Sequence, residues 1–133
     1  HHRVPPVGGA KTKNPLWSAK VEEVMDACEE MFVPINATFA PGLDADKLKE
    51  LREAAVPKMA ASAAQIEEVL KKNKSQTYCV GSAMSVADLK LYFSVNTVNN
   101  LDHMPTDLFD KYPTIMASYN ALNANEKVKA FME

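Results

Sequence analysis

The chain has few residues of the kinds that build disulfide, metal or nucleophilic sites. It contains two cysteines and three histidines. Cys28 and Cys79 form neither a Cys-x-x-Cys pair nor a zinc-ligand spacing, so cysteine usage favours two reduced thiols over a disulfide or a metal site. His1 and His2 open the chain and look like the remainder of a purification tag. His103 alone remains, which leaves almost nothing from which to build a Cys-His or Ser-His-Asp catalytic arrangement.

The sequence also lacks long apolar runs and a marked excess of one charge. No run approaches the ~18 uninterrupted apolar residues of a membrane-spanning helix, and no charged-then-apolar leader opens the chain. Fifteen Lys and Arg residues stand against seventeen Asp and Glu residues, and no basic cluster is long enough to hold a phosphate backbone. We therefore expect neither a membrane nor nucleic acid as a partner, and we predict a soluble, cytoplasmic protein.

The length of 133 residues fits one domain. Such a domain buries roughly 70% of the surface that its unfolded chain exposes, so it can hold a full core without metal or disulfide. Residues 1–13, "HHRVPPVGGAKTK", show no periodicity and are predicted to be a tail or linker. We expect the domain to occupy residues 14–133.

Apolar residues recur with the 3.6-residue period of a helix over most of the chain. The segment "QTYCVG" is the only strand-like stretch, and it is too isolated to build a sheet. The fold class is therefore predicted to be all-α, a bundle of about five helices. The expected helices cover residues 15–39, 45–73, 86–101 and 113–124, with a short last one through Val128 and Phe131.

Proline and capping residues are expected to set the ends and bends of the first two helices. Asn14 can cap the first helix, with Pro15 at the first helical position, where a missing N–H has no consequence. Asp44 can cap the second helix. Pro34 and Pro57 lie inside these two helices, and each predicts a kink.

The stretch from Gly81 to Leu89, "GSAMSVADL", has the features of a helix start. Ser85 and Asp88 form a predicted capping box, in which each side chain accepts a hydrogen bond from the other residue's backbone N–H. Met84 and Leu89 can pack together as a hydrophobic staple, and Gly81 permits the bend that leads in. Standing alone, Ser-x-x-Asp is equally well explained as an ordinary helix start.

A capping box matters most where the start of a helix is buried, because water cannot satisfy the first N–H groups there. The segment "VADLKLYFSVNTV" that follows Ser85 is apolar on most of its faces. We therefore predict that the helix starting at Ser85 is the central, buried helix of the bundle.

The order Gly81, Met84, Ser85, Asp88 and Leu89 follows a long proline-containing helix that ends "EEVLKKNKSQTYCVG". This arrangement resembles the C-terminal domain of the cytosolic glutathione S-transferases, where it marks the start of the buried central helix. The ending "LFDKYPTIMASYNALNANEKVKAFME" is similar to that family as well. The resemblance covers about residues 15–133 and is nearest to the sigma or alpha-like classes.

The resemblance implies candidate binding residues on the first helix. Glu30 falls where an acid of the family reaches across a dimer to the γ-glutamyl amine of glutathione, although the family usually has Asp there. One turn further, Phe32, Val33 and Asn36 fall where the family lines its hydrophobic co-substrate pocket. A solvated acidic face is the alternative for Glu30, and core packing is the alternative for the apolar residues.

The resemblance also implies a role. A transferase of this family joins an N-terminal thioredoxin-like domain, which holds glutathione and activates its thiol, to an all-helical domain. These residues show no β-α-β pattern. We therefore expect the co-substrate-binding half of an enzyme that conjugates glutathione to hydrophobic electrophiles. Alone, it is predicted to be inactive, with no catalytic residue and no bound glutathione; its expected partners are a thioredoxin-like domain, an electrophile and, in a homodimer, a second copy.

The sequence is also compatible with two other interpretations. One is a non-catalytic interaction module of the kind found in elongation-factor 1B gamma subunits and some aminoacyl-tRNA synthetases. The second is a helical bundle unrelated to the family. Cys28 is expected to be buried and unreactive, Cys79 to be a candidate for exposure, and His103 to be a cation at a helix end.

Overall fold

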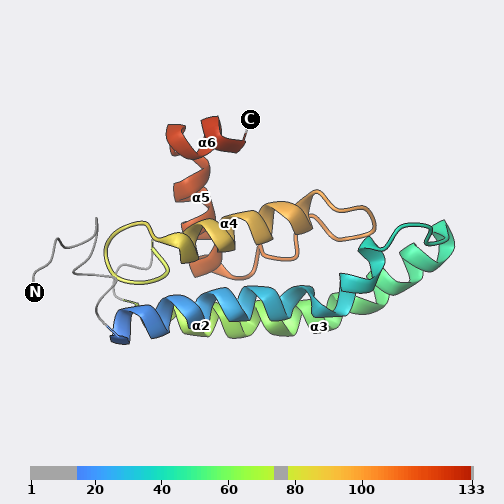
Figure 1. Cartoon of the computed structure of the whole chain (residues 1–133), viewed down its shortest axis with the longest axis horizontal. Coiled ribbons are helices and arrows are strands. Elements are labelled where there is room, and N and C mark those ends of the chain that lie inside the picture. Colours follow the sequence, from blue (N-terminus) through green and yellow to red (C-terminus); the bar gives the residue numbers. More distant parts are fainter. Residues whose placement is uncertain (1–14, 74–77, 133) are drawn as a thin grey trace, which may run out of the picture.

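The computed structural model describes residues 15–73 and 78–132, and all regular structure within them is helical (Figure 1). The predicted all-α class is confirmed, and the described residues contain five α-helices, against a prediction of about five. The predicted tail over residues 1–13 and the Asn14 cap lie outside the described residues. The helices are α2 (Pro15–Phe32), a 3-10 helix η1 (Val33–Phe39), α3 (Ala45–Lys71), α4 (Val86–Asn99), α5 (Pro113–Asn123) and α6 (Glu126–Met132).

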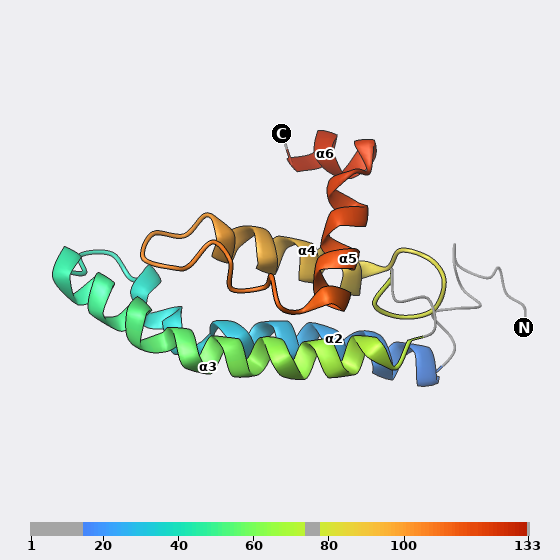
Figure 2. The ribbon, with the colours of Figure 1, turned by 180° about the vertical axis from the view of Figure 1, so that it is seen from behind.

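The helices pack in two directions. α2 and α3 lie side by side along the long axis of the molecule, and α4 lies along them in the same direction as α2 (Figures 1 and 2). α5 crosses this layer and contacts both α4 and α3, while α6 contacts α5 at its far end. η1 stands at the opposite end of α2 from the loop that leads into α4.

The first helix differs from its prediction. One kinked helix was expected over residues 15–39, but the α-helix ends at Phe32 and the chain continues as the 3-10 helix η1. The reason is Pro34, whose missing N–H cannot bond to the carbonyl of Glu30. The tighter 3-10 winding places residues three apart on one face. Ile35 and Thr38 accordingly share the buried face of η1.

α3 matches its prediction more closely. Its apolar inner face is buried at five positions and half-buried at Leu48 and Leu51. Pro57 lies inside the helix, and the N-terminal half of α3 turns away from the line of its C-terminal half (Figure 2). Asp44 stands at the N-cap with an extended backbone, but its side chain makes no capping hydrogen bond. The buried inner-face residues are Ala55, Met59, Ala63, Ile66 and Leu70.

α4 is the central helix of the bundle, as predicted. Four of its apolar side chains and the Asp88 carboxylate are fully buried, and the main core packs around them from α2, α3 and α5. A smaller cluster of Tyr92, Leu122 and Val128 joins α4 to α5 and α6. The apolar residues of α4 in the main core are Ala87, Leu91, Val95 and Val98.

The predicted capping box at the start of α4 is present. The Ser85 backbone N–H donates to Asp88 Oδ2 at 2.8 Å, and the Ser85 hydroxyl donates to the same oxygen at 3.2 Å. The serine half of the box is weaker, because the Asp88 N–H also bonds to the Ser85 carbonyl oxygen at 3.1 Å. The sequence did not predict that Asp88 Oδ1 accepts the Cys79 N–H at 2.8 Å. The carboxylate thus closes the loop before α4 onto the helix.

Two further parts of the predicted helix start behave differently. Gly81 has a φ of 71°, in the left-handed region that favours glycine, and its α-carbon faces the Trp17 ring. Leu89 packs against the cluster that contains Tyr92, whereas Met84 is 44% exposed. The structure thus supports the predicted bend and gives no support to the predicted staple.

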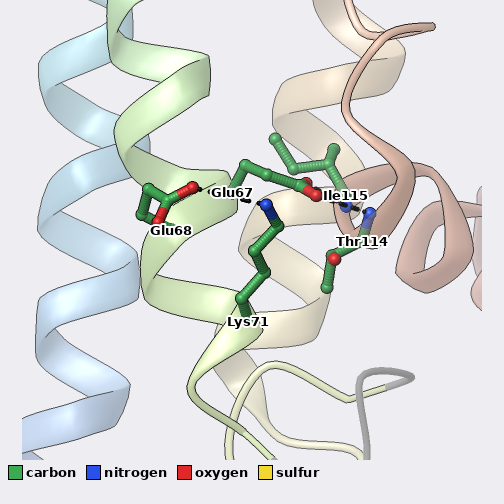
Figure 3. Close-up of polar contacts among 5 residues, drawn as sticks. All are labelled: Glu67, Glu68, Lys71, Thr114 and Ile115. Atoms are coloured by element: carbon green, nitrogen blue, oxygen red, sulfur yellow. Dashed lines mark hydrogen bonds and ion pairs between the residues drawn. The ribbon is translucent and has the colours of Figure 1, made fainter.

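Glu67 connects α3 to the start of α5 (Figure 3). Its side chain is 4% exposed, and its two oxygens accept the backbone N–H groups of Thr114 and Ile115 at 2.9 Å each. These are among the N–H groups that lack partners within α5, while Pro113 has no N–H to satisfy. Negative charge is also favourable at a helix N-terminus. Glu67 therefore caps α5 from another helix.

Substituting Glu67 tests this cap against a matched neighbour. Glu67→Gln replaces one acceptor oxygen by an NH₂ group that faces a backbone donor, so we expect the free energy of unfolding to fall by about 1–3 kcal/mol. Glu68→Gln removes only the exposed ion pair of Glu68 with Lys71 (3.4 Å). It should change the free energy of unfolding by less than about 0.5 kcal/mol. Urea unfolding followed by circular dichroism measures both. Equal effects of the two changes would contradict the cap.

Candidate functional site

The four residues predicted to bind substrate lie at the junction of α2 and η1. Glu30 is exposed in the last turn of α2, and Phe32, the last residue of α2, is half-buried against the main core. Val33 and Asn36 are exposed on η1. The structure therefore brings Val33 and Asn36 together at one end of the molecule, and it supports core packing for much of Phe32.

One face of η1 is exposed along its whole length. Val33, Asn36 and Phe39 are three residues apart, so the 3-10 winding places them in one row. Val33 is 62% exposed and Phe39 is 50% exposed. The single α-helix predicted over residues 15–39 would have continued through Phe39, but the change of winding at Pro34 places Phe39 on the exposed face of η1. Phe39 thus joins the candidate site, and the sequence pattern alone did not identify it.

Glu30 and Glu29 occupy different environments on α2. Glu29 pairs with Lys90 of α4 at 2.8 Å. Each residue of an α-helix is rotated about 100° from the one before it, so Glu30 points away from this pair. Glu30 makes no ion pair with the residues that the structure describes. Its carboxylate can therefore meet solvent or a cation from outside the domain. This position is compatible with a solvated acidic face and also with a contact to glutathione.

Arg52 of α3 holds the buried face of η1. Its Nε donates to Thr38 Oγ1 at 3.1 Å, and its Nη1 donates to the carbonyl oxygen of Asp102 at 3.2 Å. Thr38 Oγ1 in turn donates to the Ile35 carbonyl oxygen at 2.6 Å. The Phe39 ring lies over the guanidinium, 5.3 Å from Cζ to the ring centroid. One side chain therefore fixes η1 to α3 and to the loop after α4, a role that the sequence did not predict.

The described residues hold no other site of obvious chemistry. Within residues 15–73 and 78–132, no group of three or more His, Cys, Asp or Glu side chains is arranged to hold a metal ion. No helix of the same residues is both long and apolar enough to cross a membrane. His103 is exposed in the turn after α4, with a left-handed φ of 67°. A cleft of about 370 Å³ lies away from η1, between α3 and residues 105–111.

A family model described as the glutathione S-transferase C-terminal domain matches residues 17–133. The chain belongs to this family. The match covers most of the chain and agrees with the all-helical architecture and the buried α4. A search of curated proteins gave no match.

Both cysteines of this glutathione S-transferase C-terminal domain are free and buried. The expectation of an exposed Cys79 is wrong, because the loop that carries it folds onto α4 and its N–H is bonded to Asp88. Burial raises the pKa of the Cys28 thiol to about 11. Burial, and then the nearby Asp88 charge, also raise the pKa of Cys79. Neither side chain is a thiolate at neutral pH, so neither is an activated nucleophile.

These raised pKa values predict the reactivity of both thiols. A thiol must be deprotonated and accessible to attack a disulfide reagent, so neither cysteine of the native domain should react with Ellman's reagent at pH 8. Both should react after the chain is unfolded in denaturant. The released thionitrobenzoate, read by absorbance, counts the reactive thiols. Rapid reaction of one thiol per native chain would contradict the buried position of Cys79 or Cys28.

Proposed function

We propose that this domain is the electrophile-binding half of a glutathione transferase, an enzyme that conjugates the glutathione thiolate to hydrophobic electrophiles. The observation that supports the proposal is the exposed row on η1 within a domain of this family. Val33 and Phe39 offer apolar surface and Asn36 offers a polar group, a combination typical of ligand sites. The row is open on one side, which fits a pocket completed by another domain.

The chemistry of the transfer requires a part that this domain does not supply. Glutathione reacts as a thiolate, which needs a hydrogen-bond donor or a positive dipole aimed at its sulfur. Among the candidate residues, Asn36 alone carries a side-chain N–H donor, and it has no positive charge. A thioredoxin-like partner domain would bind glutathione and activate it, and this domain alone would bind none. Two free thiols also suit a reducing compartment such as the cytoplasm.

Glu30 would complete the glutathione site of a second copy. Its carboxylate is exposed on α2 and is not engaged by Lys90, so it can meet the γ-glutamyl amine of glutathione held by a partner subunit in a homodimer. Glu is one methylene longer than the Asp that is usual in the family, so the contact would be made at a longer reach. The alternative role as an interaction module gains no support from the family match.

Activity with and without a thioredoxin-like half tests the proposal. The chain alone, given glutathione and chlorodinitrobenzene, should show no turnover above the rate in buffer. With a thioredoxin-like half restored, turnover should appear, and Glu30→Gln should raise the KM for glutathione about 10-fold, equivalent to ~1.4 kcal/mol of binding.

The matched control is Glu22→Gln, which removes an exposed acid of the same helix and should leave KM unchanged. Equal KM values for the Glu30 and Glu22 variants would remove Glu30 from the site. Turnover by the chain alone would contradict the proposal that a thioredoxin-like half is needed to bind and activate glutathione.

A further inference from the structure

The cleft of about 370 Å³ lies between the middle of α3 and the loop that joins α4 to α5. Val56 and Ala60 line it from α3, on either side of Pro57 in the sequence, and the loop contributes residues 105, 107, 108, 110 and 111. Sites for small molecules usually have volumes of roughly 300–1,000 Å³. The cleft is therefore large enough for a small organic ligand.

Both walls of the cleft are held in place by the rest of the domain. The Tyr112 hydroxyl donates to the Ala60 carbonyl oxygen at 2.9 Å, which ties the end of the loop to α3. Leu108 and Phe109 are buried in the main core, and the Phe109 carbonyl oxygen accepts the Tyr112 N–H at 2.9 Å. A ligand would not have to order these walls, and a preformed site lowers the cost of binding.

The loop side of the cleft carries an excess of negative charge. Asp107 and Asp110 are exposed, and the Asp110 N–H donates to the Asp107 carbonyl oxygen at 3.1 Å, so both acids lie on one turn. Neither carboxylate makes an ion pair with a described residue. Among the described residues that line the cleft, Lys111 is the one cation, and its Nζ lies 5.7 Å from the centroid of the Tyr112 ring. Two acids against one lysine favour a cationic ligand.

The remaining lining of the cleft is apolar. Leu108 belongs to the main core, and Val56 packs against it. Ala60 and Pro105 complete this apolar surface. A ligand that suits both features combines one ammonium group with a compact apolar body. The ammonium can make charge-assisted hydrogen bonds to carboxylates, and the body can remove apolar surface from water.

We propose that the cleft between α3 and residues 105–111 binds a small organic amine in its protonated form. The ammonium donates to the carboxylates of Asp107 and Asp110, and the apolar body lies against Val56 and Leu108. This site goes beyond the proposed transferase role, because it lies away from η1 and needs neither glutathione nor a second domain. It can therefore be tested on the chain as it is, and its failure would leave the transferase proposal untouched.

Binding of phenethylammonium and 3-phenylpropanoate to the full chain, measured by calorimetry, tests the site. Phenethylammonium should bind saturably, and 3-phenylpropanoate, with the same ring on a two-carbon chain and the opposite charge, should bind at least about 10-fold more weakly. Asp107→Asn and Asp110→Asn each remove one carboxylate and should weaken phenethylammonium about 5-fold. Asp102→Asn, which removes an exposed acid of the same loop outside the cleft, should leave its binding unchanged.

A further variant tests the cleft itself without a change of charge. Ala60→Leu adds apolar atoms at a residue that lines the cleft, so it should weaken phenethylammonium about 10-fold by occupying the space of the apolar body. Circular dichroism and the melting temperature check that this variant is folded.

Four outcomes would overturn the site. They are a failure of phenethylammonium to saturate, equal binding of the two probes, Asp107→Asn and Asp110→Asn variants that bind like Asp102→Asn, and a folded Ala60→Leu variant that binds like the original chain. In those cases the two acids serve only as solvated groups on the surface of the loop.

Discussion

The fold depends on one buried carboxylate, Asp88, at the start of the central helix α4. Val86, the first residue of α4, is 56% exposed, whereas Ala87 and Asp88 are fully buried. The Asp88 carboxylate accepts the N–H of Ser85, the N-cap residue, and the N–H of Cys79 in the loop before the helix. With its start fixed in this way, α4 packs against α2 and α5, and its apolar side chains join the core to which α3 also contributes.

Two more buried charged side chains of the domain are held by neutral groups. Glu67, like Asp88, is a buried carboxylate held by backbone N–H groups, and neither makes an ion pair with a described residue. Arg52 is held by neutral groups in a corresponding way. Backbone dipoles thus replace opposite side-chain charges as the partners of buried ions. Arg52 matters for the candidate site because it fixes the position of η1 against α3.

The sequence predicted the features that depend on neighbours in the chain. The capping box spans three residues, the helices follow from a regular apolar period, and Pro57 marks the bend region of α3. Contacts between distant residues escaped prediction, as with Glu67 and Thr114, which are 47 positions apart. The burial of Cys79 depends in the same way on the folding of a loop onto α4.

The candidate site was predicted less completely than the fold. Glu30, Phe32, Val33 and Asn36 came from the family resemblance, and their roles remain predictions. The structure changed their context at Pro34, since a 3-10 helix in place of a kinked α-helix exposes Phe39 and aligns it with Val33. A proline in a helical pattern signals an interruption, but it does not state which winding follows. Phe39 and Arg52 therefore became visible only in three dimensions.

Hydrogen exchange at the Cys79 and Ser85 amides, followed by NMR, tests the central role of Asp88 most directly. If both amides donate to a buried carboxylate, they should exchange as slowly as the core amides of α4, near the rate of global unfolding. Exchange of either amide at the rate of an unprotected loop would show that the carboxylate does not hold the start of α4, and the account of the fold would fail there.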